Sequence, residues 1–177
     1  MKKIIIMSLL ASIAAFSATP KETAIAEKSL LLGMHIQENK EQIVDLGRFA
    51  AFKELQKQIE NVDCNIKASE NSDSEYLRGL CSFINKKQNN ENHKETLEAM
   101  NTLAYAALSS KKPKYYCSFA LALYTTNEWN KADYILRKVS AYGNDEVCDI
   151  ARNIPKNAIK KSLNTSKDAS NECAIQK

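Results

Sequence analysis

The sequence predicts an all-α fold, and three of its features favour that class. Apolar residues recur at spacings of three and four rather than two, which is the period of amphipathic helices and not of strands. Only four glycines and three prolines occur in 177 residues, so β-hairpin turns have few candidate positions. Alanine, leucine, lysine and glutamate are abundant, and all four are good helix formers. We therefore expect helices joined by polar loops.

The N-terminal segment has the pattern of a secretory signal peptide. The pair Lys2–Lys3 precedes an apolar run from Ile4 to Phe16, and small residues follow it. This run is shorter than the roughly 20 apolar residues that cross a bilayer. Small side chains at Ala15 and Ser17 favour cleavage between Ser17 and Ala18. We expect a signal peptide over residues 1–17 and a secreted or periplasmic mature chain with no membrane span.

Two helices are predicted at the start of the mature chain, from about Lys21 to Ile36 and from about Glu41 to Val62. In the later half of the second, Phe52, Leu55 and Ile59 follow one another at spacings of three and four, which places them on one face. The two helices are expected to form an antiparallel hairpin.

Polar loops delimit the next two predicted helices. The loop from Asn65 to Ser74 precedes a third helix that extends to about Lys86, and Ser72 or Asp73 is available as its cap. A fourth helix is predicted from about His93 to Ser109, because its apolar residues fall on one face. A lysine-rich turn with a proline at its centre ends this helix and begins the next.

The segment from Lys114 to Tyr142 predicts a tightly packed helical hairpin. Small side chains at Ala120 and Ala132 allow its two helices to cross closely, and larger apolar residues then seal the contact. This pattern resembles a tetratricopeptide or Sel1-type repeat. Its patterned positions are Tyr116, Phe119, Ala120, Leu123, Trp129, Ala132, Leu136 and Val139.

The resemblance implies that helical hairpins stack on one another. A degenerate unit would precede the hairpin, and a capping hairpin, divided at Pro155, would follow it over residues 145–163. The predicted fold is therefore a single all-α domain over residues 18–161, either a short solenoid of this kind or an irregular helical bundle. Residues 162–177 are polar and are expected to be disordered.

Five cysteines follow the signal peptide, and an oxidising compartment makes disulfides their expected state. Five choices of the odd cysteine and three pairings of the other four give fifteen two-bridge arrangements. A bridge between Cys64 and Cys81 would staple the loop between the second and third helices. In a repeat stack, Cys117 and Cys148 lie near the starts of neighbouring helices and would form a second bridge, which leaves Cys173 unpaired.

No motif predicts catalysis, a metal site or a cofactor. The cysteines form no CxxC pair, and the two histidines, His35 and His93, are interpreted as a helix-end residue and a solvent-facing residue. No GxSxG motif and no glycine-rich phosphate loop is present. Losing Lys2 and Lys3 lowers the formal net charge from +4 to +2, so no field towards nucleic acid is expected. We expect a non-enzyme.

Six of the seven tyrosines lie between residues 105 and 142, and most are expected to pack between helices. Tyr115 and Tyr124 lie off the main apolar faces and are the candidates for contact with another protein or peptide. The sequence thus favours an exported helical interaction module, such as an adaptor or a secretion or assembly accessory. The alternative is a disulfide-stabilised secreted effector or enzyme inhibitor.

Overall fold

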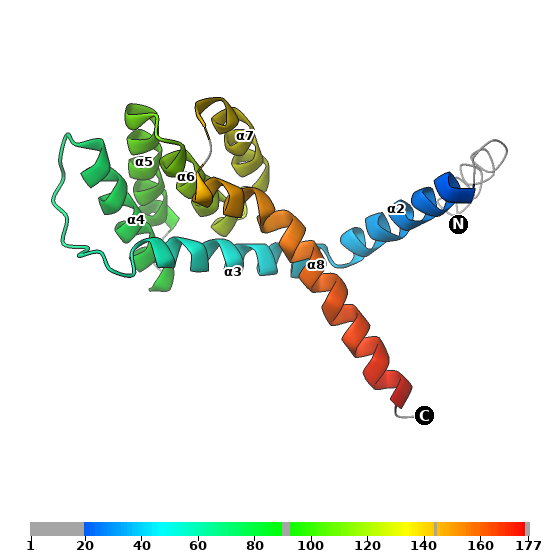
Figure 1. Cartoon of the computed structure of the whole chain (residues 1–177). Helices are drawn as coiled ribbons and strands as arrows, with labels where there is room; N and C mark the ends of the chain where they lie inside the picture. The colour runs from blue at the N-terminus through cyan, green and yellow to red at the C-terminus, as the bar shows by residue number, and fades with distance from the viewer. Residues whose placement is uncertain (1–19, 90–92, 144, 176–177) are drawn as a thin grey trace. The chain divides into compact units, whose positions relative to one another are not determined.

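The computed structural model describes residues 20–89, 93–143 and 145–175, and every regular element within these ranges is helical, as predicted (Figure 1). The predicted signal peptide lies outside them. The chain divides into two compact units, residues 1–40 and 41–177, so the domain expected over 18–161 includes parts of both. The helices are α2 (Pro20–Glu38), α3 (Lys40–Gln58), α4 (Ser72–Gln88), α5 (His93–Ser110), α6 (Pro113–Thr125), α7 (Trp129–Val139) and α8 (Glu146–Ile175), with a 3-10 turn at Ser140–Tyr142.

In the first unit, α2 has apolar residues on all sides rather than along one stripe. Its large exposed apolar side chains are Ile25, Leu30, Leu31, Leu32 and Met34. The helix ends where the Asn39 side chain donates a hydrogen bond to the carbonyl oxygen of His35, at 3.0 Å. His35 therefore lies at the helix end, in the position that the sequence predicted.

In the second unit, helices that follow one another in the chain pack together: α4 on α5, α5 on α6, and α6 on α7. Figure 1 shows α4 to α7 in a row, with α3 running across it. The tight crossing of α4 and α5 depends on Gly79, because a Cβ atom there would lie 3.0 Å from the backbone nitrogen of Leu103. Asn71 caps α4 by accepting a hydrogen bond from the Asp73 amide, one position before the predicted caps.

The hairpin predicted from Lys114 to Tyr142 corresponds to α6 and α7. Ala120 and Ala132 are both fully buried, as close crossing of the two helices requires. The turn between the helices includes Asn127 in the left-handed region, at a φ of 68°. Of the remaining patterned positions, Leu123, Leu136 and Val139 are buried, whereas Tyr116, Phe119 and Trp129 are partly buried.

Helix α8 is longer and more continuous than predicted. Pro155 lies inside it and does not divide it into two helices. The helix also includes most of the segment that was expected to be a disordered tail. Ser162, the first residue of that segment, is buried and donates a hydrogen bond to Oε1 of Gln42 at 2.9 Å. This contact with α3 explains why residue 162 belongs to the folded unit.

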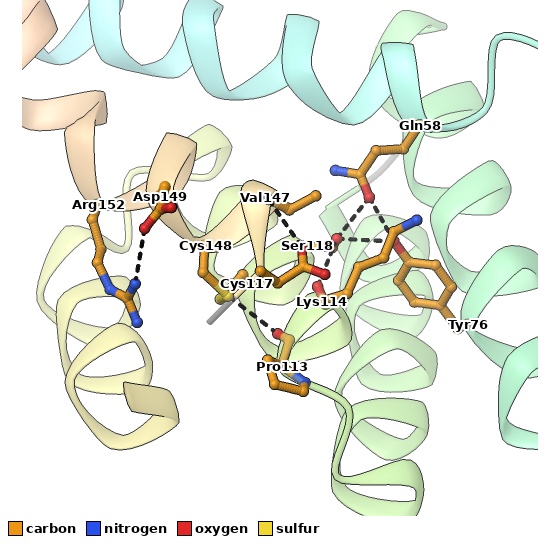
Figure 2. Close-up of a disulfide and its surroundings, with 11 residues drawn as sticks. Gln58, Tyr76, Pro113, Lys114, Cys117, Ser118, Val147, Cys148, Asp149 and Arg152 are labelled. Carbon is orange, nitrogen blue, oxygen red and sulfur yellow. Dashed lines mark hydrogen bonds and ion pairs between the residues drawn. A yellow bond between two sulfur atoms is a disulfide. The ribbon is translucent and has the colours of Figure 1, made fainter. Parts of the chain in front are cut away.

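The structure pairs Cys64 with Cys81, and Cys117 with Cys148, which are the two bridges that the sequence favoured. The first links the chain after α3 to α4. The second links α6 to the first turn of α8, where both cysteines are fully buried (Figure 2). The side chain of Cys173 is not among those that the structure describes.

We expect proteolysis of the unreduced protein to give linked peptides for these two pairs and for no other pair of the four cysteines. Replacing Cys117 and Cys148 with Ser should lower the free energy of unfolding by about 3–4 kcal/mol, since the bridge closes a loop with a sequence separation of 31. Peptide mass mapping and urea unfolding measure these effects. A linked peptide joining Cys64 to Cys117 or Cys148 would contradict the fold.

Helix α3 is held against the row of helices by a close contact between Gly47 and Trp129. A Cβ atom at residue 47 would overlap the indole ring of Trp129. Nearby, Nε of Arg48 donates a hydrogen bond to the carbonyl oxygen of Thr125 at the end of α6, at 3.3 Å. Because glycine is a poor helix former, its presence inside α3 is explained by this packing.

We therefore expect Gly47→Ala to destabilise the protein by about 1–3 kcal/mol, because the indole must move to admit a methyl group. Gly33→Ala is the matched control, since nothing lies within 4 Å of a Cβ atom there and alanine is the better helix former. Urea unfolding followed by tryptophan emission measures both variants. Equal stability of the wild type and Gly47→Ala would show that the two helices do not approach this closely.

Candidate functional site

The two tyrosines predicted to contact a partner are buried, so the expectation that they form an exposed surface is wrong. Tyr124 is fully buried and Tyr115 is 7% exposed. Tyr115 stacks on Tyr76 with ring centroids 3.8 Å apart, and the Tyr124 hydroxyl donates a hydrogen bond to Oδ1 of Asp133. Burial raises the pKa of both phenols above the usual value for tyrosine.

The reason for this burial is the position of α6, which packs against α5, α7 and α8. Nine of its residues are buried, including ones that lie off its main apolar face. Periodicity identifies a helix and its main apolar face, but it does not say how many neighbours the helix has.

A buried polar cluster ties three helices together beside the Cys117–Cys148 bridge. Oε1 of Gln58 in α3 accepts hydrogen bonds from the Tyr76 hydroxyl, at 2.5 Å, and from the Ser118 hydroxyl, at 2.8 Å. The hydroxyls of Tyr76 and Ser118 are 2.9 Å apart (Figure 2). No base lies in this cluster, and burial raises the pKa of the Tyr76 phenol. We interpret the cluster as structural.

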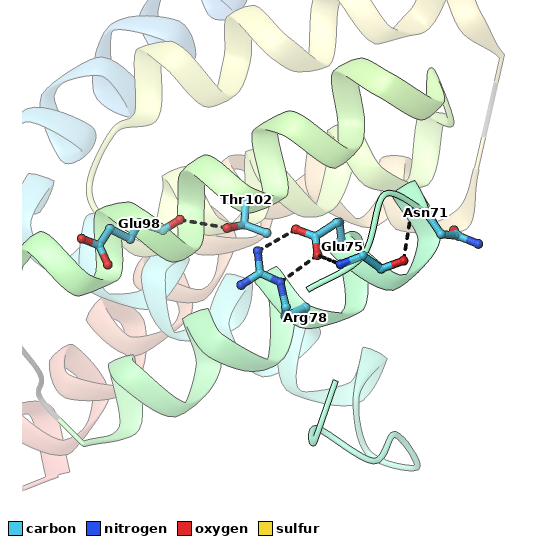
Figure 3. Close-up of polar contacts among 6 residues, drawn as sticks. Asn71, Glu75, Arg78, Glu98 and Thr102 are labelled. Carbon is cyan, nitrogen blue, oxygen red and sulfur yellow. Dashed lines mark hydrogen bonds and ion pairs between the residues drawn. The ribbon is translucent and has the colours of Figure 1, made fainter. Parts of the chain in front are cut away.

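Glu75 is the one buried acidic residue in the described part of the chain, and its contacts also indicate a structural role. Its carboxylate accepts hydrogen bonds from Nε and Nη2 of Arg78, at 2.9 and 2.6 Å, and from the Ser69 amide (Figure 3). The Arg78 guanidinium holds the pKa of this carboxyl below its usual value. A carboxylate held in its charged form does not carry a proton at neutral pH.

Because the pKa of Glu75 is lowered by folding, its charged form stabilises the folded state above about pH 4.3, and this contribution is lost as the pH falls. We expect Glu75→Gln to cost about 1–3 kcal/mol near neutral pH and progressively less in acid. Urea unfolding across this pH range measures the difference. Glu98→Gln, on the exposed surface of α5, is the control, and an equal loss in both variants would contradict the assigned role of Glu75.

The candidate binding surface is an apolar groove between α6 and α7. It has a volume of about 340 Å³ and is lined by Phe119, Leu123, Asn130, Lys131, Tyr134 and Ile135. Phe119 and Leu123 lie one turn apart on α6, as do Asn130 and Tyr134 on α7. Tyr134 is 56% exposed, and the Lys138 ammonium lies 5.6 Å from the centre of its ring. The groove thus presents one aromatic side chain that the core does not use.

The sequence identified Phe119 and Leu123 only as packing positions and did not single out Tyr134. The residues of the groove recur at one-turn spacings on both helices, and this recurrence is the one sequence pattern that could have indicated the groove. Spacing does not show how deeply each side chain is buried. Phe119, for example, belongs to the predicted contact between the two helices and also lines the groove.

The described residues give little support for three kinds of function: metal binding, membrane crossing and cysteine-based catalysis. They contain no group of three or more histidine, cysteine or acidic side chains that is arranged to hold a metal ion. None of their helices combines the length and apolar character needed to cross a membrane. Cys64, Cys81, Cys117 and Cys148 are all in disulfides. The side chain of His93 lies outside the description.

No known family, curated protein or solved structure matches this chain.

Proposed function

We propose that this chain is an exported helical interaction module, and that the groove between α6 and α7 receives apolar side chains of a partner protein or peptide. The observation that carries this proposal is the apolar lining of the groove together with the exposure of Tyr134. Tyrosine is enriched at the centres of protein interfaces, because its ring buries a large area at a small cost in conformational entropy.

The rigidity of the groove supports the same proposal. Its walls belong to two helices that are locked together through Ala120 and Ala132, so little order has to be gained on binding. The surface that the groove exposes is far smaller than the roughly 800 Å² that each partner buries in a standard interface. We propose that the partner also covers part of α5, where Leu97, Tyr105 and Leu108 are exposed along one face.

Export and repeat architecture are part of this proposal. The pattern of residues 1–17 supports secretion through a cleaved signal peptide, and the two disulfide pairs suit an oxidising compartment. The packing of α4 to α7 on their chain neighbours supports a short solenoid of the tetratricopeptide or Sel1 type. Such modules act by binding, and we propose no catalytic role for this chain.

Panning of a random peptide library displayed on phage against the mature protein tests the proposal. Selected peptides should be rich in large apolar residues, and Tyr134→Ala should weaken their binding about tenfold or more, because the aromatic wall of the groove is lost. Tyr142→Ala is the matched control, since this tyrosine is 54% exposed but lies in the 3-10 turn, outside the groove and outside the exposed face of α5.

NMR spectroscopy of the complex gives the location of the bound peptide. Shifts should concentrate on Phe119, Leu123 and Ile135. Selection of no peptide, or of peptides that bind the wild type and Tyr134→Ala equally, would reject the groove as the binding site.

A further inference from the structure

We propose that a second hollow, on the α8 side of α7, is a binding site for a single carboxylate group attached to a short apolar body. This cleft has a volume of about 470 Å³ and is lined by Tyr124, Asp133, Leu136, Arg137, Ser140 and Arg152. Its residues come from α6, α7, the 3-10 turn and α8, so the cleft forms only when these elements are packed together. The site does not include the apolar groove and does not depend on the function proposed for it.

Arg137 supplies hydrogen-bond donors that the protein does not use. Its Nε donates to the backbone oxygen of Asp133 at 3.3 Å, which fixes the plane of the guanidinium. Its two terminal nitrogens have no partner among the residues that the structure describes. A guanidinium fixed in this way presents two parallel donors, the arrangement that matches the two oxygens of a carboxylate.

The second cation, Arg152, lines the cleft from α8. Its Nη1 lies 3.4 Å from Oδ1 of Asp149, which is a long ion pair (Figure 2). Asp149 does not line the cleft, whereas Arg152 does. Ser140 contributes a hydroxyl that already donates to the backbone oxygen of Arg137, whereas the Tyr124 hydroxyl is buried and donates to Asp133.

Charge matching favours a carboxylate over a phosphate. Because Arg152 is already paired with Asp149, Arg137 is the cation of the lining that a ligand would neutralise, and one carboxylate is enough to do so. A phosphate monoester carries about −1.5 to −2 at neutral pH, and Asp133 would repel the additional charge. Tyr124 and Leu136, which are both buried, form the floor of the cleft, and the remainder of the ligand lies over them.

The cleft has a built-in spectroscopic reporter. Trp129 is the only tryptophan in the chain, and its ring lies edge-on to Tyr124, with centroids 5.1 Å apart. A ligand held over the buried Tyr124 therefore acts on Trp129 only through this ring contact, because Trp129 does not itself line the cleft. Tryptophan emission can then follow binding with no added label.

The first experiment titrates the mature protein, at neutral pH, with N-acetyl-leucine and with N-acetyl-leucinamide. We expect the acid to change the emission of Trp129 saturably, to shift the NMR signal of the Arg137 Nε–H group, and the amide to do neither. A short peptide that ends in leucine distinguishes the two sources of a carboxylate. Binding of the peptide identifies a chain terminus, whereas binding of N-acetyl-leucine alone identifies a small free acid, and both results support the site.

The second experiment compares matched charge variants. Arg137→Gln should weaken binding of N-acetyl-leucine by about tenfold or more, and Arg137→Lys should have an intermediate effect because it keeps the charge but loses the paired donors. Lys138→Gln removes the same charge from the neighbouring residue, whose side chain lies over Tyr134 and outside the cleft, and should bind as the wild type does. Arg152→Gln tests separately whether the second arginine of the cleft, which lies on α8, contributes to binding of N-acetyl-leucine.

Four results would overturn the proposal. These are equal responses to the acid and the amide, a response to inorganic phosphate but not to the acid, equal losses in Arg137→Gln and Lys138→Gln, and the absence of both the emission change and the NMR shift. Urea unfolding of each variant confirms that a loss of binding is not a loss of fold.

Discussion

The fold of the second unit depends on the contacts that hold α6 in place between its neighbouring helices. Its N-terminal half is joined to α8 by the Cys117–Cys148 bridge. The next residue, Ser118, joins it to α3 by a hydrogen bond to Gln58, and the Ser118 hydroxyl lies 2.9 Å from the Tyr76 hydroxyl of α4. Its C-terminal end is held by the hydrogen bond from Arg48 to the Thr125 carbonyl. Covalent, polar and apolar contacts thus restrain the same helix from different sides, which explains why so much of it is buried.

The polar cluster of Gln58, Tyr76 and Ser118 joins three helices, but it leaves some buried hydrogen-bonding groups without partners among the described residues. The Gln58 carboxamide oxygen accepts two hydroxyl donors, so the oxygen atoms of the cluster are satisfied. The amide nitrogen of the same side chain and Nε1 of Trp129 are both buried, and neither has a hydrogen-bond partner among the residues that the structure describes. Each unpaired group costs free energy. The apolar contacts of α3 with the row, through Ala51 and Leu55, therefore have to offset that cost.

Sequence reasoning predicted those features that depend on neighbours in the chain. The helices, the burial of Ala120 and Ala132, and the Cys64–Cys81 pair follow from local spacing and from the proximity of consecutive helices. The Cys117–Cys148 pair joins α6 to α8 and was expected instead from the stacking of neighbouring repeat units. It failed where a residue's surroundings come from distant segments. Tyr115 and Tyr124 are covered because helices on several sides enclose α6, and Ser162 is buried because α3 lies beside it. Neither the apolar groove nor the pairing of Arg137 with Arg152 in one cleft can be read from spacing, since each hollow joins different elements.

The contacts that restrain the fold and the surfaces proposed for binding lie on different helices. The restraints act on α6, whereas α7 is short, packs mainly on α6, and carries on its two sides the side chains that the core does not need, Tyr134 and Arg137. Because α6 forms a wall of both hollows, its restraints fix their shape, and because Tyr134 and Arg137 are exposed, changing them removes few core contacts. The exposed surface of α7 can therefore change without loss of the core. This is the arrangement that the two proposed binding sites require, since binding residues are most precise on elements that other contacts hold rigid.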